Sequence, residues 1–598
     1  MNKVFKVIWN HATQTWTAVS ELGHAKGKTK SKKIVKLTAL AGAVLGVVGT
    51  AQAAVELGSS SITIKSDNPA ADHATKGINN INIGTGANTY RNEGLNAAGE
   101  PIVSHDAIAI GSSATGTGDK AVAIGKGASA TKENGIAIGF NATNQSIDSV
   151  AIGREATSSK DMDVAIGKQA KATGGESLAF GSQSKASGQA TVAVGKESNA
   201  SGSSAVSAGY QSAAAGDNAV AVGNKASASA TNAIATGLRA TATGTRAIAT
   251  GAGSSATGEQ SLANGFTAKA SGNDSIALGN AANASMANAT AIGTGAVASD
   301  NNAVALGGTG TTKANGNNAF AASGGSASGE SAIAIGASAT ANSRGGIAVG
   351  WNSESAVNAV GIGFNAKAKA NNTVAIGVQA NNDNAISNNY SSVSVGVATR
   401  ARAVGSMAMG VSADASGKYS IALGSGEVSG DYTANANYPK ATGEKAIAIG
   451  YNSNSSNANA TAIGAGATAS GTDSFAGVSG TAGGNSSIAI GKGASITAPT
   501  AGTTLGGQDS IAIGSSASAQ QHSSISVGFG ASSNGVRSVA IGPKASATDE
   551  DTIAIGTGGV GADKNNQAVG ANGGGVGSTL VNGVSGVSLY YGAKSSGK

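Results

Sequence analysis

Short apolar strands recur along the chain at a fixed spacing. A glycine follows each segment of the type Ile/Val–Ala–Ile/Val, and the step from Gly111 to Gly125 repeats without change as far as Gly307; the pattern resumes at Gly336 and runs with interruptions to about Gly570. We number positions from this glycine as zero, so that −3 and −1 are large and −2 is usually alanine. Side chains alternate across a strand, which places −3 and −1 on one face and −2 on the other. The fixed period predicts an all-β fold, a parallel β-roll or solenoid of 14-residue coils.

The second half of each repeat predicts another strand made of small residues. Positions +3 and +5 are usually Ala, Ser or Thr, and a second glycine often stands at +7. Because glycine adopts positive φ without a Cβ penalty, we expect glycines to make both corners of the coil. The candidate corner glycines at position 0 are Gly111, Gly125, Gly139, Gly153, Gly167 and Gly181.

The two faces of the first strand are expected to have different roles. Large side chains at −3 and −1 are predicted to fill the coil. These candidate core residues are Ile108, Ile110, Val150, Ile152, Ile511, Ile513, Val539 and Ile541. So thin a coil buries too little apolar surface to offset the loss of chain entropy on its own. The small side chains at −2 would allow another chain to approach this face closely. The predicted subunit contact is therefore Ala109, Ala151 and Ala540, with the number of chains left open.

The amino-acid composition excludes several classes of protein and partner. The 598 residues include 92 glycines but only 3 % aromatic residues, which argues against several conventional cores. The net charge of +7 resides in residues 1–53, which hold eight lysines and one glutamate, so the remaining chain is neutral. We therefore expect no nucleic acid partner. Cysteine is absent, which excludes disulfides and thiolate metal sites.

The N-terminus predicts export. A basic stretch from Lys26 to Lys36 precedes an apolar run, Leu37–Val48, that is too short to span a bilayer comfortably. Small residues then predict cleavage between Ala53 and Ala54, with no membrane insertion of the mature chain. Residues 1–22 resemble the extended signal peptide region of large Gram-negative autotransporters. The matching residues are Asn2-Lys3, Phe5-Lys6-Val7, Trp9-Asn10, Thr15-Trp16 and Ala18-Val19-Ser20.

The repeats resemble a known family as well. Segments such as Ser149-Val150-Ala151-Ile152-Gly153 and Ser538-Val539-Ala540-Ile541-Gly542 are similar to YadA-like head repeats of trimeric autotransporter adhesins, over about 105–570. The resemblance implies a left-handed roll, a homotrimer, and binding to host extracellular matrix protein such as collagen, or to a cell-surface receptor. It also implies a bacterial cell-surface location if an anchor is present in the full gene product, and otherwise a periplasmic or secreted fragment.

The predicted organisation departs from that family at its end. We expect an extended signal peptide at 1–53, an N-terminal cap region at 54–104, head repeats at 105–570 and a Gly-rich tail at 571–598. No heptads or barrel strands are apparent, which favours a truncated gene or fragment. The 14-residue spacing of the glycines is interrupted near 308–330, 378–392, 425–445, 472–487 and 492–508, where we expect loop insertions.

Candidate chemistry is sparse. Aromatic residues gather at +1 or in the 425–445 insertion, and Trp351, Tyr432 and Tyr438 are candidate ligand contacts, against the alternatives of rings covering corner glycines and a tolerated loop. We identify no catalytic, cofactor or metal residues, and His522 stands alone in sequence. The sequence favours a non-catalytic adhesin. The main alternative is a solenoid enzyme or binding protein acting on polysaccharide; ice-binding and calcium-binding repeats fit less well, because neither Thr nor Asp keeps the period.

Overall fold

The computed structural model divides the chain into two units, Met1–Gln52 and Ala53–Lys598. In the first unit, β1 (Phe5–Asn10) and β2 (Thr15–Ser20) pair as an antiparallel hairpin. The predicted cleavage residue Ala53 lies outside the described residues, whereas Ala54 begins β3 (Ala54–Gly58). The structure describes residues 5–10, 15–20, 54–58, 61–65, 79–89, 104–308, 311–380, 391–427, 437–498, 506–548, 550–555 and 587–589.

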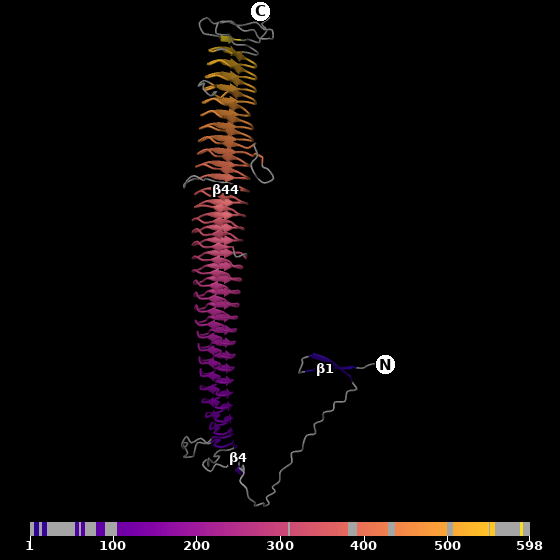
Figure 1. The fold of residues 1–598 in the computed structure, drawn as a ribbon, viewed down its shortest axis with the longest axis vertical. Coiled ribbons are helices and arrows are strands. Elements are labelled where there is room, and N and C mark those ends of the chain that lie inside the picture. The colour runs from indigo at the N-terminus through magenta and orange to yellow at the C-terminus, as the bar shows by residue number, and fades with distance from the viewer. Residues whose placement is uncertain are drawn as a thin grey trace, which may run out of the picture. The chain divides into compact units, whose positions relative to one another are not determined.

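The second unit is a column of stacked coils, which Figure 1 shows running past β44 (Val374–Ile376). It starts with an antiparallel pair, β3 and β4 (Ser61–Lys65). From β4 onward, each strand of this first sheet pairs in parallel with the next, through β5 (Ile81–Ile83) to β6 (Ile108–Ile110). The expected all-β parallel solenoid is confirmed.

Each coil contributes one strand to each of two parallel sheets. Even-numbered strands of three residues form the first sheet and recur once per period from β6 to β34 (Val304–Leu306). Odd-numbered strands of two residues form the second sheet and recur likewise from β7 (Thr115–Gly116) to β33 (Val297–Ala298). Register is strict, because Val150 of β12 (Val150–Ile152) lies beside Val164 of β14 (Val164–Ile166) one period later.

Strands continue through the remaining coils, where the first sheet is unbroken and the second divides in two, one part ending at Ala368 and the other starting at Arg400. These strands are β35 (Lys313–Ala314), β36 (Phe320–Ala322), β37 (Ser326–Ala327), β38 (Ile333–Ile335), β39 (Thr340–Ala341), β40 (Ile347–Val349), β41 (Glu354–Ser355), β42 (Val360–Ile362), β43 (Lys367–Ala368), β45 (Val393–Val395), β46 (Arg400–Ala401), β47 (Met407–Met409), β48 (Asp414–Ala415), β49 (Ile421–Leu423), β50 (Lys440–Ala441), β51 (Ile447–Ile449), β52 (Asn454–Ser455), β53 (Thr461–Ile463), β54 (Thr468–Ala469), β55 (Phe475–Gly477), β56 (Thr481–Ala482), β57 (Ile488–Ile490), β58 (Ser495–Ile496), β59 (Ile511–Ile513), β60 (Ser518–Ala519), β61 (Ile525–Val527), β62 (Ser532–Ser533), β63 (Val539–Ile541), β64 (Ser546–Ala547), β65 (Ile553–Ile555) and β66 (Val587–Leu589).

The inside of each coil is filled by alanine and serine. In the coil around Gly153, the side chains of Ala151 at −2, Ala156 at +3 and Ser158 at +5 are fully buried. Alanines at these phases stack from coil to coil into continuous interior clusters. The space between the two strands of a coil is narrow and is mostly filled by small side chains; the largest fully buried side chain among the described residues is Ile496, at +5 of its coil.

This interior reverses the predicted roles of the two faces. Ala109, Ala151 and Ala540, predicted to contact another subunit, are instead 0 % exposed inside their own coil. The large residues predicted to fill the coil point outward and are only half-buried, with Ile513 37 % and Ile541 39 % exposed. The same correction applies to Ile108, Ile110, Val150, Ile152, Ile511 and Val539. The alternation of the two faces was predicted correctly, but side-chain volume decides which face lies inside the coil.

The glycines at position 0 do adopt the left-handed half of φ space. In Gly111, Gly125, Gly139, Gly153, Gly167 and Gly181, φ lies between +129° and +137°. The glycines at +7 serve a different purpose from the predicted one. A Cβ on Gly174 would lie 1.7 Å from the Gly188 carbonyl oxygen, and its φ is not positive. These residues are needed for close approach of successive coils.

Replacing Gly153 with alanine should destabilise the stack. The residue has φ +131°, and an added Cβ would lie 2.4 Å from the Gly167 carbonyl oxygen. Backbone strain of this kind costs about 1–3 kcal/mol, and the clash adds to it. We expect a lower melting temperature by circular dichroism. Gly530→Asn is the matched control, because Asn tolerates its φ of +63° and only Lys544 Cγ lies near, at 3.6 Å. Equal melting of both variants would contradict this assignment.

The interruptions are accommodated between paired strands. Val374 pairs with Val393, Ile421 with Ile447 and Ile488 with Ile511, and each partner lies further along the chain than one period. Each pair remains hydrogen-bonded in register, so the first sheet is continuous across these interruptions.

One of the expected loop insertions is wrong. The 472–487 segment holds β55 and β56, and Phe475 pairs with Ile488, so this coil is one residue shorter than the period. In the 308–330 segment, by contrast, Val304 pairs with Phe320, so the coil there is two residues longer than the period. The sequence pattern shows the change of phase, but only strand pairing distinguishes a long coil from a short one.

Candidate functional site

A largely apolar row lies on the outside of the first sheet, with polar side chains at −1 in Thr236, Thr250 and Asn264. It consists of the −3 and −1 side chains of successive coils, stacked in register as in Val150–Val164 and Ile152–Ile166. Several members are more than one third exposed, including Ile292 at 39 % and Ile463 at 41 %. Monomeric soluble proteins seldom expose a contiguous apolar surface of this extent, so this apolar row is a candidate interface.

The outward row of the second sheet is polar. It consists of the +4 side chains, and where charged residues are adjacent they usually compensate one another. Lys367 Nζ forms an ion pair with Glu354 Oε1, and Arg400 Nε lies 3.2 Å from Asp414 Oδ2. The two sheets face apart across the alanine interior, so the apolar row and this polar row lie on opposite sides of the coil.

Amide and carboxylate side chains form ladders along the corner at +2. Gln169 Nε2 donates to Glu155 Oε2 at 2.7 Å, and Gln183 Nε2 donates to Gln169 Oε1 at 3.1 Å. We call Glu155, Gln169, Gln183 and Glu197 the corner ladder. The Gln169 amide, followed by the Arg154 guanidinium, lowers the pKa of the Glu155 carboxyl. Hydrogen bonds from Gln211 and Lys196 lower the pKa of Glu197 in the same way.

The aromatic residues at +1 stand at the surface. Trp351 is 51 % and Phe364 43 % exposed, and their rings stack one coil apart with centroids 4.8 Å apart and an interplanar angle of 16°. The Arg154 guanidinium lies over the Phe140 ring at 5.6 Å. These rings pack on neighbours along the stack while keeping edges in solvent, so Trp351 stays a candidate ligand contact.

Tyr438 has a structural role that sequence alone did not suggest. The Arg400 guanidinium lies 4.9 Å and the Lys440 ammonium 4.5 Å from the centroid of its ring. The next residue, Pro439, is buried. These contacts attach the end of the 425–445 insertion to the coils. The other candidate from that insertion, Tyr432, lies outside the described residues.

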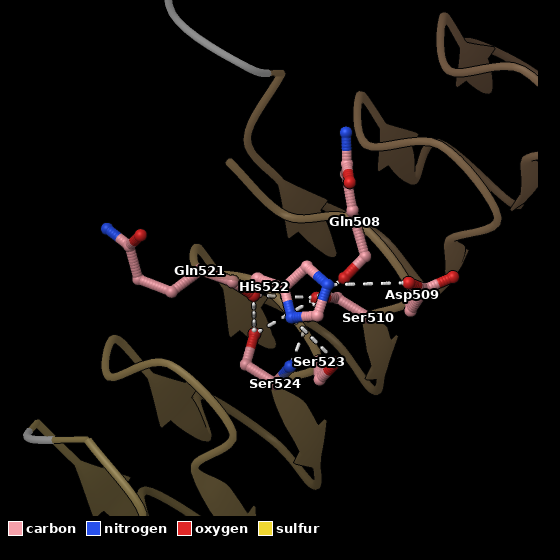
Figure 2. Close-up of polar contacts among 7 residues, drawn as sticks. All are labelled: Gln508, Asp509, Ser510, Gln521, His522, Ser523 and Ser524. Carbon is pink, nitrogen blue, oxygen red and sulfur yellow. Dashed lines mark hydrogen bonds and ion pairs between the residues drawn. The ribbon is translucent and has the colours of Figure 1, made fainter. Parts of the chain in front are cut away.

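A polar cluster surrounds His522, as Figure 2 shows. Its Nε2 lies 3.6 Å from Asp509 Oδ2, and its Nδ1 is 2.8 Å from the Ser523 hydroxyl. Ser510 and Ser524 both donate to the Gln521 carbonyl at 2.7 Å. His522 is thus not alone, because the period brings Asp509 beside Ser523. These hydrogen bonds join two coil corners. Among the described residues, no three His, Cys, Asp or Glu side chains gather to hold a metal.

Comparison with known families matches both parts of the chain. Residues 1–50 match the extended signal peptide of the type V secretion system, which indicates export. No curated protein matches the chain. Within the described residues we find no helix able to cross a membrane. The YadA head domain repeat matches 117–142, 146–170, 172–198, 200–226, 228–254, 256–282, 284–308, 327–353, 355–380, 401–426, 441–467, 455–476, 506–531 and 533–558.

These head repeats span more than half of the sequence, and they coincide with the stacked coils of the structure. The signal peptide and the repeats occur in one chain, and together they are the signature of a single family. The chain therefore belongs to the trimeric autotransporter adhesins.

Proposed function

We propose that this chain is the head of a non-catalytic cell-surface adhesin that assembles as a homotrimer. The observation that carries the assembly is the apolar row, which one chain leaves half-exposed along the first sheet. Packing three copies of this row around a common axis would remove it from water at a gain of about 25 cal/mol per Å². The interface is therefore assigned to −3 and −1, in place of the alanines first predicted.

The ligand of the assembled head is proposed to be a host extracellular matrix protein, with collagen as the first candidate. A surface that repeats from coil to coil offers many similar sites, and linked weak sites raise avidity without any new contact. The exposed +1 rings, including Trp351, supply such sites. Exposure on the outer membrane would follow from export if the full gene product carries an anchor.

Binding to collagen should fall gradually as coils are removed. Deletions of one, two or three whole coils within 112–307 keep the register, because strands there pair once per period. We expect a graded loss of solid-phase collagen binding, since no single coil is unique. Deletion of 428–436 alone is the control for the 425–445 insertion and keeps Tyr438 and β50. Complete loss on that deletion, with the coils intact, would contradict a distributed surface.

A further inference from the structure

A groove of about 750 Å³ runs across neighbouring coils between residues 141 and 199. The corner ladder forms one side, and the outward row of the second sheet forms the other. Because this sheet faces away from the apolar row, the groove stays accessible in the proposed trimer. It is polar on both sides, and the residues that line it include no aromatic ring.

Two uncompensated lysines lie side by side in this groove. Lys171 of β15 (Lys171–Ala172) pairs in register with Lys185 of β17 (Lys185–Ala186), and both are exposed. Adjacent strands are about 4.8 Å apart, so two like charges are held close together. Their neighbours in the row are the neutral residues Thr157 and Asn199. Among the described strands of the second sheet, no other adjacent pair carries two lysines.

The carboxylates in the groove do not neutralise these lysines. Glu155 Oε1 is 3.0 Å from Arg154 Nε, and Glu197 Oε1 is 3.3 Å from Lys196 Nζ. Each carboxylate therefore has its own cation beside it at +1. The lowered pKa values of both glutamates agree with carboxylates that stay ionised and paired. An anion entering the groove finds two positive charges that have no other partner among the described residues.

The corner ladder also lacks one donor. It places two amides between two carboxylates, and each amide presents its NH₂ to one neighbour and its oxygen to the other. Gln169 donates to Glu155 and Gln183 donates to Gln169. The junction between Gln183 and Glu197 then has acceptors on both sides, and turning either amide only moves the conflict to another junction. A hydroxyl group supplied from outside would satisfy it.

We propose that this groove binds a linear acidic polysaccharide along the coil axis. Its anionic groups would pair with Lys171 and Lys185, and its hydroxyls would donate to the corner ladder. An extended acidic peptide fits less well, since its ionised carboxylates have no hydroxyl hydrogen to donate to the corner ladder. Single-stranded nucleic acid is disfavoured by the absence of aromatic stacking partners along the groove. The site is separate from the proposed binding of matrix protein.

The test measures binding of the full-length exported protein to immobilised polymers by surface plasmon resonance. The probes are heparin, which carries sulfates, hyaluronan, which carries only carboxylates, neutral dextran and poly-glutamate. We expect binding to heparin or hyaluronan, little to dextran, and weaker binding to poly-glutamate. The two acidic polysaccharides distinguish sulfate from carboxylate as the preferred anion.

Lys171→Gln combined with Lys185→Gln should reduce polysaccharide affinity at least tenfold. Lys269→Gln is the matched control, since Lys269 occupies the same position of the second sheet between Ser255 and Asn283. Gln183→Met should reduce affinity for polysaccharide by a few-fold without changing the charge. Collagen binding of the double variant should be unchanged, which separates this site from the proposed matrix function.

Three results would overturn the proposal. One is an equal loss with Lys269→Gln, which would mean that any surface lysine contributes. Another is poly-glutamate binding as tight as that of the polysaccharides. The third is failure of both acidic polysaccharides to bind while circular dichroism shows an intact fold.

Discussion

Replacing Ala151 with aspartate should unfold the coil that contains it. Ala151 is fully buried and lies in register between Ala137 and Ala165, inside the coil. A carboxylate there would be removed from water with no free donor, because the backbone N–H groups of the strand already bond to neighbouring coils. We expect a loss of several kcal/mol, seen as a large fall in melting temperature and new proteolytic cleavage near residue 151.

Asp163 shows what a buried carboxylate requires in this fold. It is 0 % exposed and accepts hydrogen bonds from the backbone N–H groups of Lys160, Gly175 and Ser177 and from the Ser177 hydroxyl. Ala151 has no such donors around it. Ala215→Asp is the control, since that alanine is exposed and the chemical change is the same. If both variants had the same melting temperature, −2 would not be an interior position.

Introducing aspartate at three neighbouring positions of the apolar row should dissociate the trimer and leave the coils folded. Ile138, Ile152 and Ile166 stack in register at −1 and are only half-buried within one chain. The chain itself keeps them in contact with water, but a trimer axis would bury nine carboxylates together. We expect analytical ultracentrifugation to show monomer or a much weaker trimer, with the β circular dichroism signal retained.

The outward row of the second sheet provides the control for this experiment. Ser129, Thr143 and Thr157 stack over the same coils on the opposite side, so aspartates there should leave the trimer intact. A triple −1 variant that remained trimeric with unchanged stability would remove the apolar row from the interface. Loss of fold in that variant would place −1 inside the coil, as the alternation alone first suggested.

The candidate binding groove could be found in the sequence only after the coils were aligned. Reading position +2 over four coils gives Glu155, Gln169, Gln183 and Glu197, and position +4 places Lys171 beside Lys185. Along the chain these residues are a full period apart and separated by ordinary surface residues. The same period explains why His522 stands alone along the sequence, because its neighbour in space, Asp509, comes from the preceding coil.

The sequence by itself determined the repeat, the parallel register and the corner at position 0. The periodic glycine limits where the chain can turn, and alternation ensures that −2 lies opposite −3 and −1. Alternation cannot say which of the two faces is inside. Only the tertiary structure decided that, because the narrow space between the two strands of a coil holds the small side chain of Ala151, which is fully buried, while Ile152 faces outward and is half-buried. The large apolar side chains therefore face outward, where their burial depends on other copies of the chain.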